Sequence, residues 1–171
     1  MKMLMITSFT LLNVIYLAAA SVQHPHLTKC PGTEKTILQF TDITVKNAKV
    51  GQEVQFIIQF DLAQTSGTDP VLLTYFSTPS GRTLDCANLV LPRELKICNG
   101  NTPMEKELNA EWNNTCPVEA GKYTARLAVR IPDNALNMQC IGDGHLIITF
   151  EVMNQGKVME CVHFPITVQL D

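Results

Sequence analysis

Apolar and polar residues alternate in the stretch GKYTARLAVRI, residues 121–131. Successive side chains of a β-strand point to opposite faces, so one face of this stretch would carry Tyr123, Ala125, Leu127, Val129 and Ile131. The other face would carry Lys122, Thr124, Arg126 and Arg130. A strand with one apolar and one charged face lies between a core and water, and the stretch therefore predicts a half-buried β-strand.

The same period of two recurs through most of the chain. Residues 52–62 place on one face Val54, Phe56, Ile58, Phe60 and Leu62. Further strands are expected, between turn-forming residues, at 36–45, 71–77, 145–153 and 158–170. The turn Asn154-Gln155-Gly156 should join the last two strands in a tight hairpin. Because Pro165 cannot donate a hydrogen bond to a sheet, the last strand should lie at an edge or carry a bulge there.

About seven short strands indicate an all-β domain, either an immunoglobulin-like two-sheet β-sandwich or an open, barrel-like cup. Residues 82–116 form the least regular region and contain three of the cysteines. This region also holds one candidate for a short helix, residues 103–112. Pro103 would take a favoured first-turn position after Thr102.

The first 20 residues have the features of a secretory signal peptide. Lys2 precedes an apolar run that extends from Met3 to Tyr16, and the small residues Ala18 and Ala20 suit signal peptidase. The run is shorter than the roughly 20 residues that cross a membrane as a helix. We therefore expect residues 1–20 to be removed and residues 21–171 to form one secreted domain.

The expected mature chain is large enough for one hydrophobic core, since a domain of about 150 residues buries roughly 68–70% of its unfolded surface. Without Lys2, 12 basic and 16 acidic side chains remain, scattered along the sequence. No basic patch is evident, so nucleic acid is not expected as a partner.

The cysteines of the mature chain are Cys30, Cys86, Cys98, Cys116, Cys140 and Cys161. An even number in a secreted domain is typical of a set of three disulfides. A zinc site is the weaker interpretation, because no Cys-x-x-Cys pair is present and the spacings match no zinc finger. The sequon Asn113-Asn114-Thr115 predicts an N-glycan at Asn113, which would place this segment at the surface.

Three features of the sequence resemble the ML lipid-recognition family. Residues 116–123, CPVEAGKY, are similar to the family's signature of Cys-Pro, a short spacer, Lys or Gly, and Tyr. Residues 145–168, which include a turn at Gly156 and the sequence MECVHFPITV, look like its closing hairpin. Cys30, just ahead of the first expected strand, looks like its N-terminal cysteine. Together these features extend over essentially the whole mature chain.

The resemblance implies a disulfide pairing. Cys30 should pair with Cys161, and in the chain-entropy model such a long loop stabilises the fold by about 4–5 kcal/mol. The family includes the ganglioside activator, the Niemann-Pick type C sterol carrier and the group 2 mite allergens. The extra cysteine pair of the last two branches is absent here between Thr41 and Gly51, so the chain looks nearer to the ganglioside activator. That analogy implies the pairs Cys86–Cys116 and Cys98–Cys140.

The family holds a lipid between two splayed sheets. The resemblance therefore implies a secreted protein that holds a sterol, glycolipid or fatty-acyl lipid for transfer or presentation. An empty cavity of roughly 500 Å³ would cost about 12 kcal/mol, so a hollow fold would profit from three disulfides. The expected lining residues are Phe56, Ile58, Phe60, Tyr123, Leu127, Val129, Ile148 and Phe150.

A second set of apolar residues lies close to expected loops. We expect them at a pocket mouth that makes transient contact with membranes, although they would equally suit the cover of an open sandwich end. This set consists of Phe76, Leu89, Val90, Leu91 and Val118. The plainer interpretation of both sets is a packed sandwich core.

No motif in the sequence indicates catalysis, a metal or a cofactor. His24 and His26 are expected in a solvated N-terminal lead and His163 in a strand. The first alternative function is a secreted protein-binding module, an adhesion or receptor-accessory domain with a solid core. The second is a hydrolase whose site is assembled from distant residues. We expect a monomer in the extracellular fluid or the lysosome.

Overall fold

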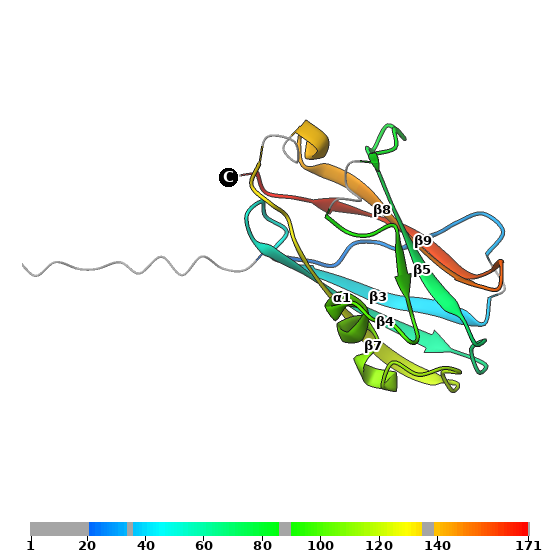
Figure 1. Cartoon of the computed structure of the whole chain (residues 1–171). Helices are drawn as coiled ribbons and strands as arrows, with labels where there is room; N and C mark the ends of the chain where they lie inside the picture. Colours follow the sequence, from blue (N-terminus) through cyan, green and yellow to red (C-terminus); the bar gives the residue numbers. More distant parts are fainter. Residues whose placement is uncertain (1–20, 34–35, 86–89, 135–138, 171) are drawn as a thin grey trace, which may run out of the picture.

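The computed structural model describes residues 21–33, 36–85, 90–134 and 139–170, and its strands form two antiparallel sheets packed face to face (Figure 1). The first sheet contains, in spatial order, β1 (Val22–Gln23), β3 (Leu38–Lys46), β4 (Glu53–Leu62) and β7 (Gly121–Arg130). The second contains β2 (Thr28–Lys29), β9 (Lys157–Thr167), β8 (His145–Asn154), β5 (Pro70–Ser77) and β6 (Glu94–Lys96). The predicted all-β sandwich is confirmed.

The alternating pattern supplies the inward faces of both sheets. Strands β4 and β7 pair without a register shift, so that Phe56 lies opposite Leu127 and Phe60 opposite Tyr123. In β4 every second residue from Val54 to Leu62 is buried. The core between the sheets is built from these positions, because a strand that turns one face to a second sheet must place its apolar residues there.

The last two strands form the predicted hairpin. Asn154 pairs with Lys157, which leaves Gln155 and Gly156 as a two-residue loop. Both loop residues have positive φ, 49° and 75°, as the turn that matches the twist of a hairpin requires. Pro165 lies beyond the part of β9 that pairs with β2, so within the described residues it occupies a sheet edge.

The predicted helix over residues 103–112 is divided into two parts. Helix α1 (Pro103–Leu108) begins with a capping box between Thr102 and Glu105 and lies beside β7 (Figure 1). A 3-10 turn, η2 (Ala110–Trp112), follows after Asn109. The division occurs because the buried Asn109 side chain donates to Lys96 O and Asn114 Oδ1, which holds this residue against the neighbouring loops.

Cys30 and Cys161 form the disulfide that the family resemblance implied. Cys30 follows β2, and the pairing of β2 with β9 brings Cys30 beside Cys161. The backbone N–H of Cys30 donates a hydrogen bond to Cys161 O. This covalent bond joins two segments that are 131 residues apart in sequence.

The implied pairs Cys86–Cys116 and Cys98–Cys140 are wrong, because Cys98 is bonded to Cys116. Cys98 follows β6 at the edge of the second sheet, and Cys116 precedes β7 at the edge of the first. The intervening helix and 3-10 turn reverse the chain, and the hydrogen bond from Asn99 N to Asn114 O holds the two segments together. Cys140 is also disulfide-bonded, and Cys86 lies outside the described residues.

A fully buried carboxylate lies next to the Cys30–Cys161 bond. Glu160 of β9 accepts hydrogen bonds from Lys29 Nζ at 3.1 Å, from Cys161 N at 3.0 Å and from Thr36 Oγ1 at 3.3 Å. These partners satisfy the charge that burial would otherwise penalise. They also attach the segment before β3 to the second sheet.

Candidate functional site

An apolar pocket, here called pocket A, lies between the sheets beneath α1 and η2. It encloses about 530 Å³ of space, which includes its opening to solvent. Of the described residues that line it, Ser66 is the one with a short polar side chain. The lining residues are Leu38, Phe40, Ile58, Phe60, Leu62, Ser66, Pro70, Leu72, Ile97, Leu108, Trp112, Val118, Ala125, Val152 and Met159.

A second apolar pocket, pocket B, lies toward the opposite end of the strands. It encloses about 520 Å³, again including its opening. Without the space open to solvent, the room left for a water-sized sphere is about 40 Å³ in pocket A and about 50 Å³ in pocket B, which fits a few water molecules and is below the range of about 300–1,000 Å³ that is usual for ligand pockets. The lining residues are Val54, Phe56, Phe76, Val90, Leu91, Val129, Ile131, Cys140, Ile141, Leu146, Ile148, Ile166 and Val168.

Both pockets are nearly closed. Among their lining residues, Ile97 of pocket A and Val90 of pocket B are half-buried, and all the others are buried. A guest molecule could therefore enter only if side chains near these two residues moved aside.

Four side chains form a wall between the pockets. They are Phe56 of β4, Leu127 of β7, Phe150 of β8 and Phe164 of β9, and none is more than 4% exposed. The ring of Phe150 meets the edge of Phe56 at 6.0 Å and that of Phe164 at 5.2 Å between centroids, so contact extends from one sheet to the other. Among the residues that the structure describes, none lines both pockets.

An aromatic cluster packs beside pocket A. Phe60 stacks on Tyr123 with centroids 5.5 Å apart, and Trp112 meets both rings edge-on at 5.9 and 5.8 Å. The indole N–H of Trp112 donates to Ile97 O at 2.7 Å, which satisfies its polar atom while the ring faces the pocket. The hydrogen bond to Ile97 and the contacts with the two rings together fix the orientation of Trp112.

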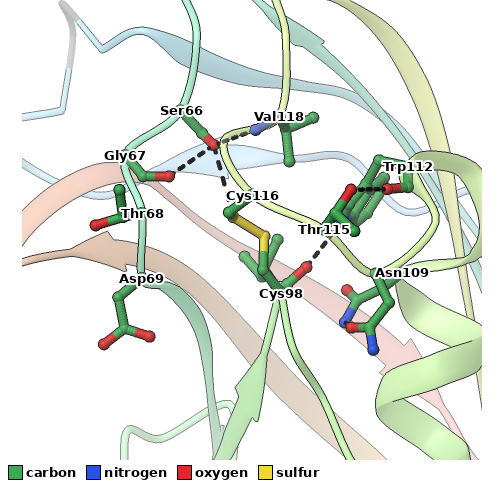
Figure 2. Close-up of a disulfide and its surroundings, with 12 residues drawn as sticks. Ser66, Gly67, Thr68, Asp69, Cys98, Asn109, Trp112, Thr115, Cys116 and Val118 are labelled. Atoms are coloured by element: carbon green, nitrogen blue, oxygen red, sulfur yellow. Dashed lines mark hydrogen bonds between the residues drawn. A yellow bond between two sulfur atoms is a disulfide. The ribbon is translucent and has the colours of Figure 1, made fainter.

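The Cys98–Cys116 disulfide joins the two sheet edges beside pocket A. Figure 2 shows Ser66 directed toward this bond and toward Val118. Val118 N donates to Ser66 Oγ and Ser66 N donates to Val118 O, each at 2.8 Å. Ser66 Oγ itself donates to Gly67 O at 3.1 Å. These bonds connect the loop before β5 to the loop before β7, so the end of the sandwich is closed by both covalent and polar contacts.

The carboxylate of Glu105 holds in place helix α1, which covers pocket A. Glu105 Oε2 accepts hydrogen bonds from Asn101 N, Thr102 N and Thr102 Oγ1, and Oε1 accepts one from Lys96 N. The backbone N–H of Thr102 contributes most to lowering the pKa of Glu105 to about 2, while burial opposes this shift. Leu108 on the same helix lines pocket A, so the hydrogen bonds of the ionised Glu105 hold part of the pocket lining in place.

The structure distributes the predicted lining residues unevenly. Leu127 and Phe150 belong to the wall and line neither pocket, and Tyr123 lies behind Phe60 with its hydroxyl bonded to Glu119 O. Leu89 lies outside the described residues. Nine residues of the two expected sets do line a pocket, and their contact with a lipid stays a prediction: Phe56, Ile58, Phe60, Phe76, Val90, Leu91, Val118, Val129 and Ile148.

The residues expected at a mouth do not lie together, and their role at a mouth stays a prediction. Val118 lines pocket A, whereas Phe76, Val90 and Leu91 line pocket B at the other end. Separate loops of the two sheets approach each other at each end, and their positions along the sequence do not reveal which end they reach. No helix in the described part of the chain is long and apolar enough to cross a membrane.

Sequence reasoning missed Leu108 and Trp112, which line pocket A from α1 and η2. Their spacing of four residues was a usable signal, because such residues share one face of a helix. It also missed Ile141, which lines pocket B from the helical residues 139–141 ahead of β8 and carries no periodic pattern.

His24 of the N-terminal lead has polar neighbours on β3. His24 Nδ1 lies 3.3 Å from Thr44 Oγ1, which donates in turn to Asp42. Over the ranges that the structure describes, no group of three or more His, Cys, Asp or Glu side chains is placed to hold a metal ion.

Comparisons with known proteins agree with this architecture. The family model described as ML domain matches residues 25–168. The crystal structure of a Niemann-Pick type C2 protein from the Japanese carpenter ant is similar in fold, with a TM-score of 0.56 and 14% identity. That match covers 84% of this chain and 99% of the ant chain.

A further match is the C-terminal domain of wzt, with 10% identity, 86% of this chain and 78% of that chain. Its TM-score is 0.47. No curated protein sequence matches the chain.

Proposed function

This chain belongs to the ML domain family, and from that premise we propose that it is a secreted protein that holds a lipid between its two sheets. The lipid would be a sterol, a glycolipid or a fatty-acyl lipid, held for transfer or presentation. The observation that carries the proposal is the apolar space that pockets A and B leave inside the sandwich.

Burial of a hydrocarbon is the driving force that such pockets offer. Each buried methylene group gains about 0.8 kcal/mol, so one long acyl chain or a sterol could contribute about 10 kcal/mol before the costs of binding. The lining presents almost no polar group, so hydrogen bonds would not select the guest's apolar part. The head group, which stays outside, would supply any finer specificity.

The disulfides and the family support an extracellular or lysosomal location after removal of residues 1–20. Cys30–Cys161 and Cys98–Cys116 suit an oxidising compartment. Family membership also supports a binding role without catalysis. We propose a monomer that makes transient contact with membranes when it takes up or releases its guest.

The direct test is native mass spectrometry of the secreted, oxidised protein, combined with lipid extraction. We expect added mass from a bound lipid, and saturable uptake of the fluorescent probe N-phenyl-1-naphthylamine that added fatty acid reverses. Protein that has been reduced, alkylated and unfolded in denaturant is the control and should take up little probe.

Clean protein with no bound lipid and no probe uptake would contradict the proposal. It would favour the protein-binding module, whose core is solid in the way that the wall around Phe150 already is. Turnover of ester or glycoside substrates by the same preparation would favour the hydrolase.

Glycosylation of Asn113 is a separate prediction. This residue is exposed and ends η2 with φ 53°, a left-handed conformation that Asn adopts more readily than most residues. Expressed in a eukaryotic secretory pathway, the protein should lose the mass of one glycan in Thr115→Ala and keep it in Thr115→Ser, which preserves the sequon. Equal masses of the two variants, apart from the side-chain difference, would show that the site is unused.

A further inference from the structure

We propose that His24 and His26 bind a divalent transition-metal ion of the kind that prefers imidazole nitrogen, in a groove at the side of the sandwich. The two histidines line this groove together, on a segment that is held at both ends, and a buried hydroxyl holds one of the rings. The groove is separate from pockets A and B, and metal binding there does not require a bound lipid.

The segment that carries the two histidines is anchored to both sheets. Before it, β1 pairs with β3 of the first sheet, and after it, β2 pairs with β9 of the second. The Gln23 side chain donates to Thr167 O at 2.7 Å and accepts from Thr167 N at 2.9 Å. Residues 24–27 therefore cross between two fixed points, and Pro25 restricts the backbone between the two histidines.

His24 and His26 share the exposed side of this segment. Both are exposed, whereas the residues between them and on either side of them are half-buried. Residues two apart in an extended chain point the same way and lie about 7 Å apart along it. Two imidazole rings at that spacing can turn toward one ion between them.

Hydrogen bonds to β3 decide which nitrogen of His24 carries the proton. The buried Thr44 hydroxyl donates to Asp42 Oδ2 at 3.0 Å, because an ionised carboxylate can only accept. A hydroxyl has one proton, so Thr44 Oγ1 must accept in its 3.3 Å contact with His24 Nδ1. In the neutral ring Nδ1 is therefore protonated, and Nε2 keeps the lone pair that a metal ion needs. Metal-binding histidines usually donate their second ring N–H to a fixed acceptor, as His24 does.

The groove provides room and charge for a hydrated cation. It leaves about 510 Å³ for water-sized spheres, against about 40 Å³ in pocket A. Lys29 also lines it, but the carboxylate of Glu160 lies 3.1 Å from Lys29 Nζ and compensates its charge. The carboxylate of Asp42 is left to attract a cation. Since the described ranges hold no group of three His, Cys, Asp or Glu side chains placed for an ion, water would complete the coordination shell.

The ligand type determines which ions should bind. Imidazole nitrogen suits Cu²⁺, Ni²⁺ and Zn²⁺, whereas Ca²⁺ and Mg²⁺ take oxygen ligands. At a given set of nitrogen ligands Cu²⁺ binds more tightly than Zn²⁺. We therefore expect affinity to fall from Cu²⁺ to Zn²⁺, with no measurable binding of Mg²⁺.

Isothermal titration of the secreted, untagged protein with CuCl₂, ZnCl₂ and MgCl₂ tests the site. One Cu²⁺ or one Zn²⁺ should bind per chain. His24→Ala and His26→Ala should each weaken binding by about tenfold or more, because each removes one of the two protein ligands. The matched controls are His145→Ala and His163→Ala, which remove the other two histidines of the chain and should bind like the unaltered protein.

Thr44→Val tests the positioning of His24 without removing a ligand. It should weaken Zn²⁺ binding by about tenfold, while Thr44→Ser, which keeps the hydroxyl, should restore it. Nitrogen NMR of the metal-free protein should show less of the Nδ1–H form of His24 in Thr44→Val than in Thr44→Ser. A loss of fold without a change of tautomer would not produce this difference between the two variants.

The titration of the unaltered protein can overturn the proposal by itself, if no Zn²⁺ or Cu²⁺ binds or if Mg²⁺ binds as tightly. Binding that is insensitive to His24→Ala and His26→Ala would also overturn it, as would sensitivity to only one of them. An equal loss in the two control variants would show adventitious binding to surface histidines.

Discussion

Replacing Cys30 and Cys161 together by serine should lower the free energy of unfolding by about 5 kcal/mol, the largest stability effect that we expect from any disulfide shown here. The bond closes a loop of 131 residues, and the entropy it removes from the unfolded chain grows with loop length. Replacing Cys98 and Cys116, which close a loop of 18 residues, should cost about 3 kcal/mol. Denaturant unfolding of the oxidised variants measures both values.

The difference in stability loss between the two double variants tests the loop-length argument more directly than either loss alone. A typical domain is stable by about 5–15 kcal/mol, so loss of the long-range bond could leave little folded protein, whereas loss of the short-range bond should not. Each variant serves as the other's control, because both remove one disulfide and add two hydroxyl groups. Equal losses, or a larger loss from the Cys98 and Cys116 pair, would contradict the loop-length argument.

Glu105→Gln should destabilise the protein by about 3 kcal/mol at neutral pH. The pKa of Glu105 is lowered to about 2 in the folded chain, against 4.5 for an ordinary glutamate. A group with a depressed pKa stabilises the fold fully above its unfolded pKa, and this contribution is lost as the pH falls through the folded pKa. The difference between the unaltered protein and Glu105→Gln should therefore be constant above about pH 5 and shrink between pH 4.5 and 2.

Glu107→Gln is the matched control, because Glu107 is exposed on the same helix. It should change stability by less than about 0.5 kcal/mol at any of these pH values. Thermal unfolding as a function of pH measures both variants. A Glu105→Gln deficit that persists unchanged at pH 2 would show that shape, and not charge, accounts for the role of the side chain. The predicted behaviour would keep the cover of pocket A anchored in a mildly acidic compartment.

Much of the fold followed from local patterns. The strands β4, β7, β8 and β9 were predicted to within a few residues, since alternation along a strand records which face meets the core. The two-residue hairpin followed from Gly156, whose positive φ suits the turn. The long-range Cys30–Cys161 bond was predicted from the family resemblance, because no local pattern in the sequence indicates which cysteines pair.

Some of the predicted residues lie at a pocket for the same reason, and their contact with a lipid stays a prediction. Ile58, Phe60, Val129 and Ile148 line a pocket because they point inward, and direction is a local property of a strand. Phe150 points inward equally, yet it lies in the wall. Period-two alternation assigns these residues to the interior without stating what each meets across the sheets.

The amino-acid sequence alone thus predicted an all-β domain and the set of residues that face its interior, because both depend on neighbours along the chain. The tertiary structure alone decided the Cys98–Cys116 bond, the position of Trp112 over pocket A and the division of the interior by Phe56 and Phe150. Each of these features depends on the distance between residues of different elements. The packing of these elements sets the distances, and the alternation of residues along a single strand does not indicate them.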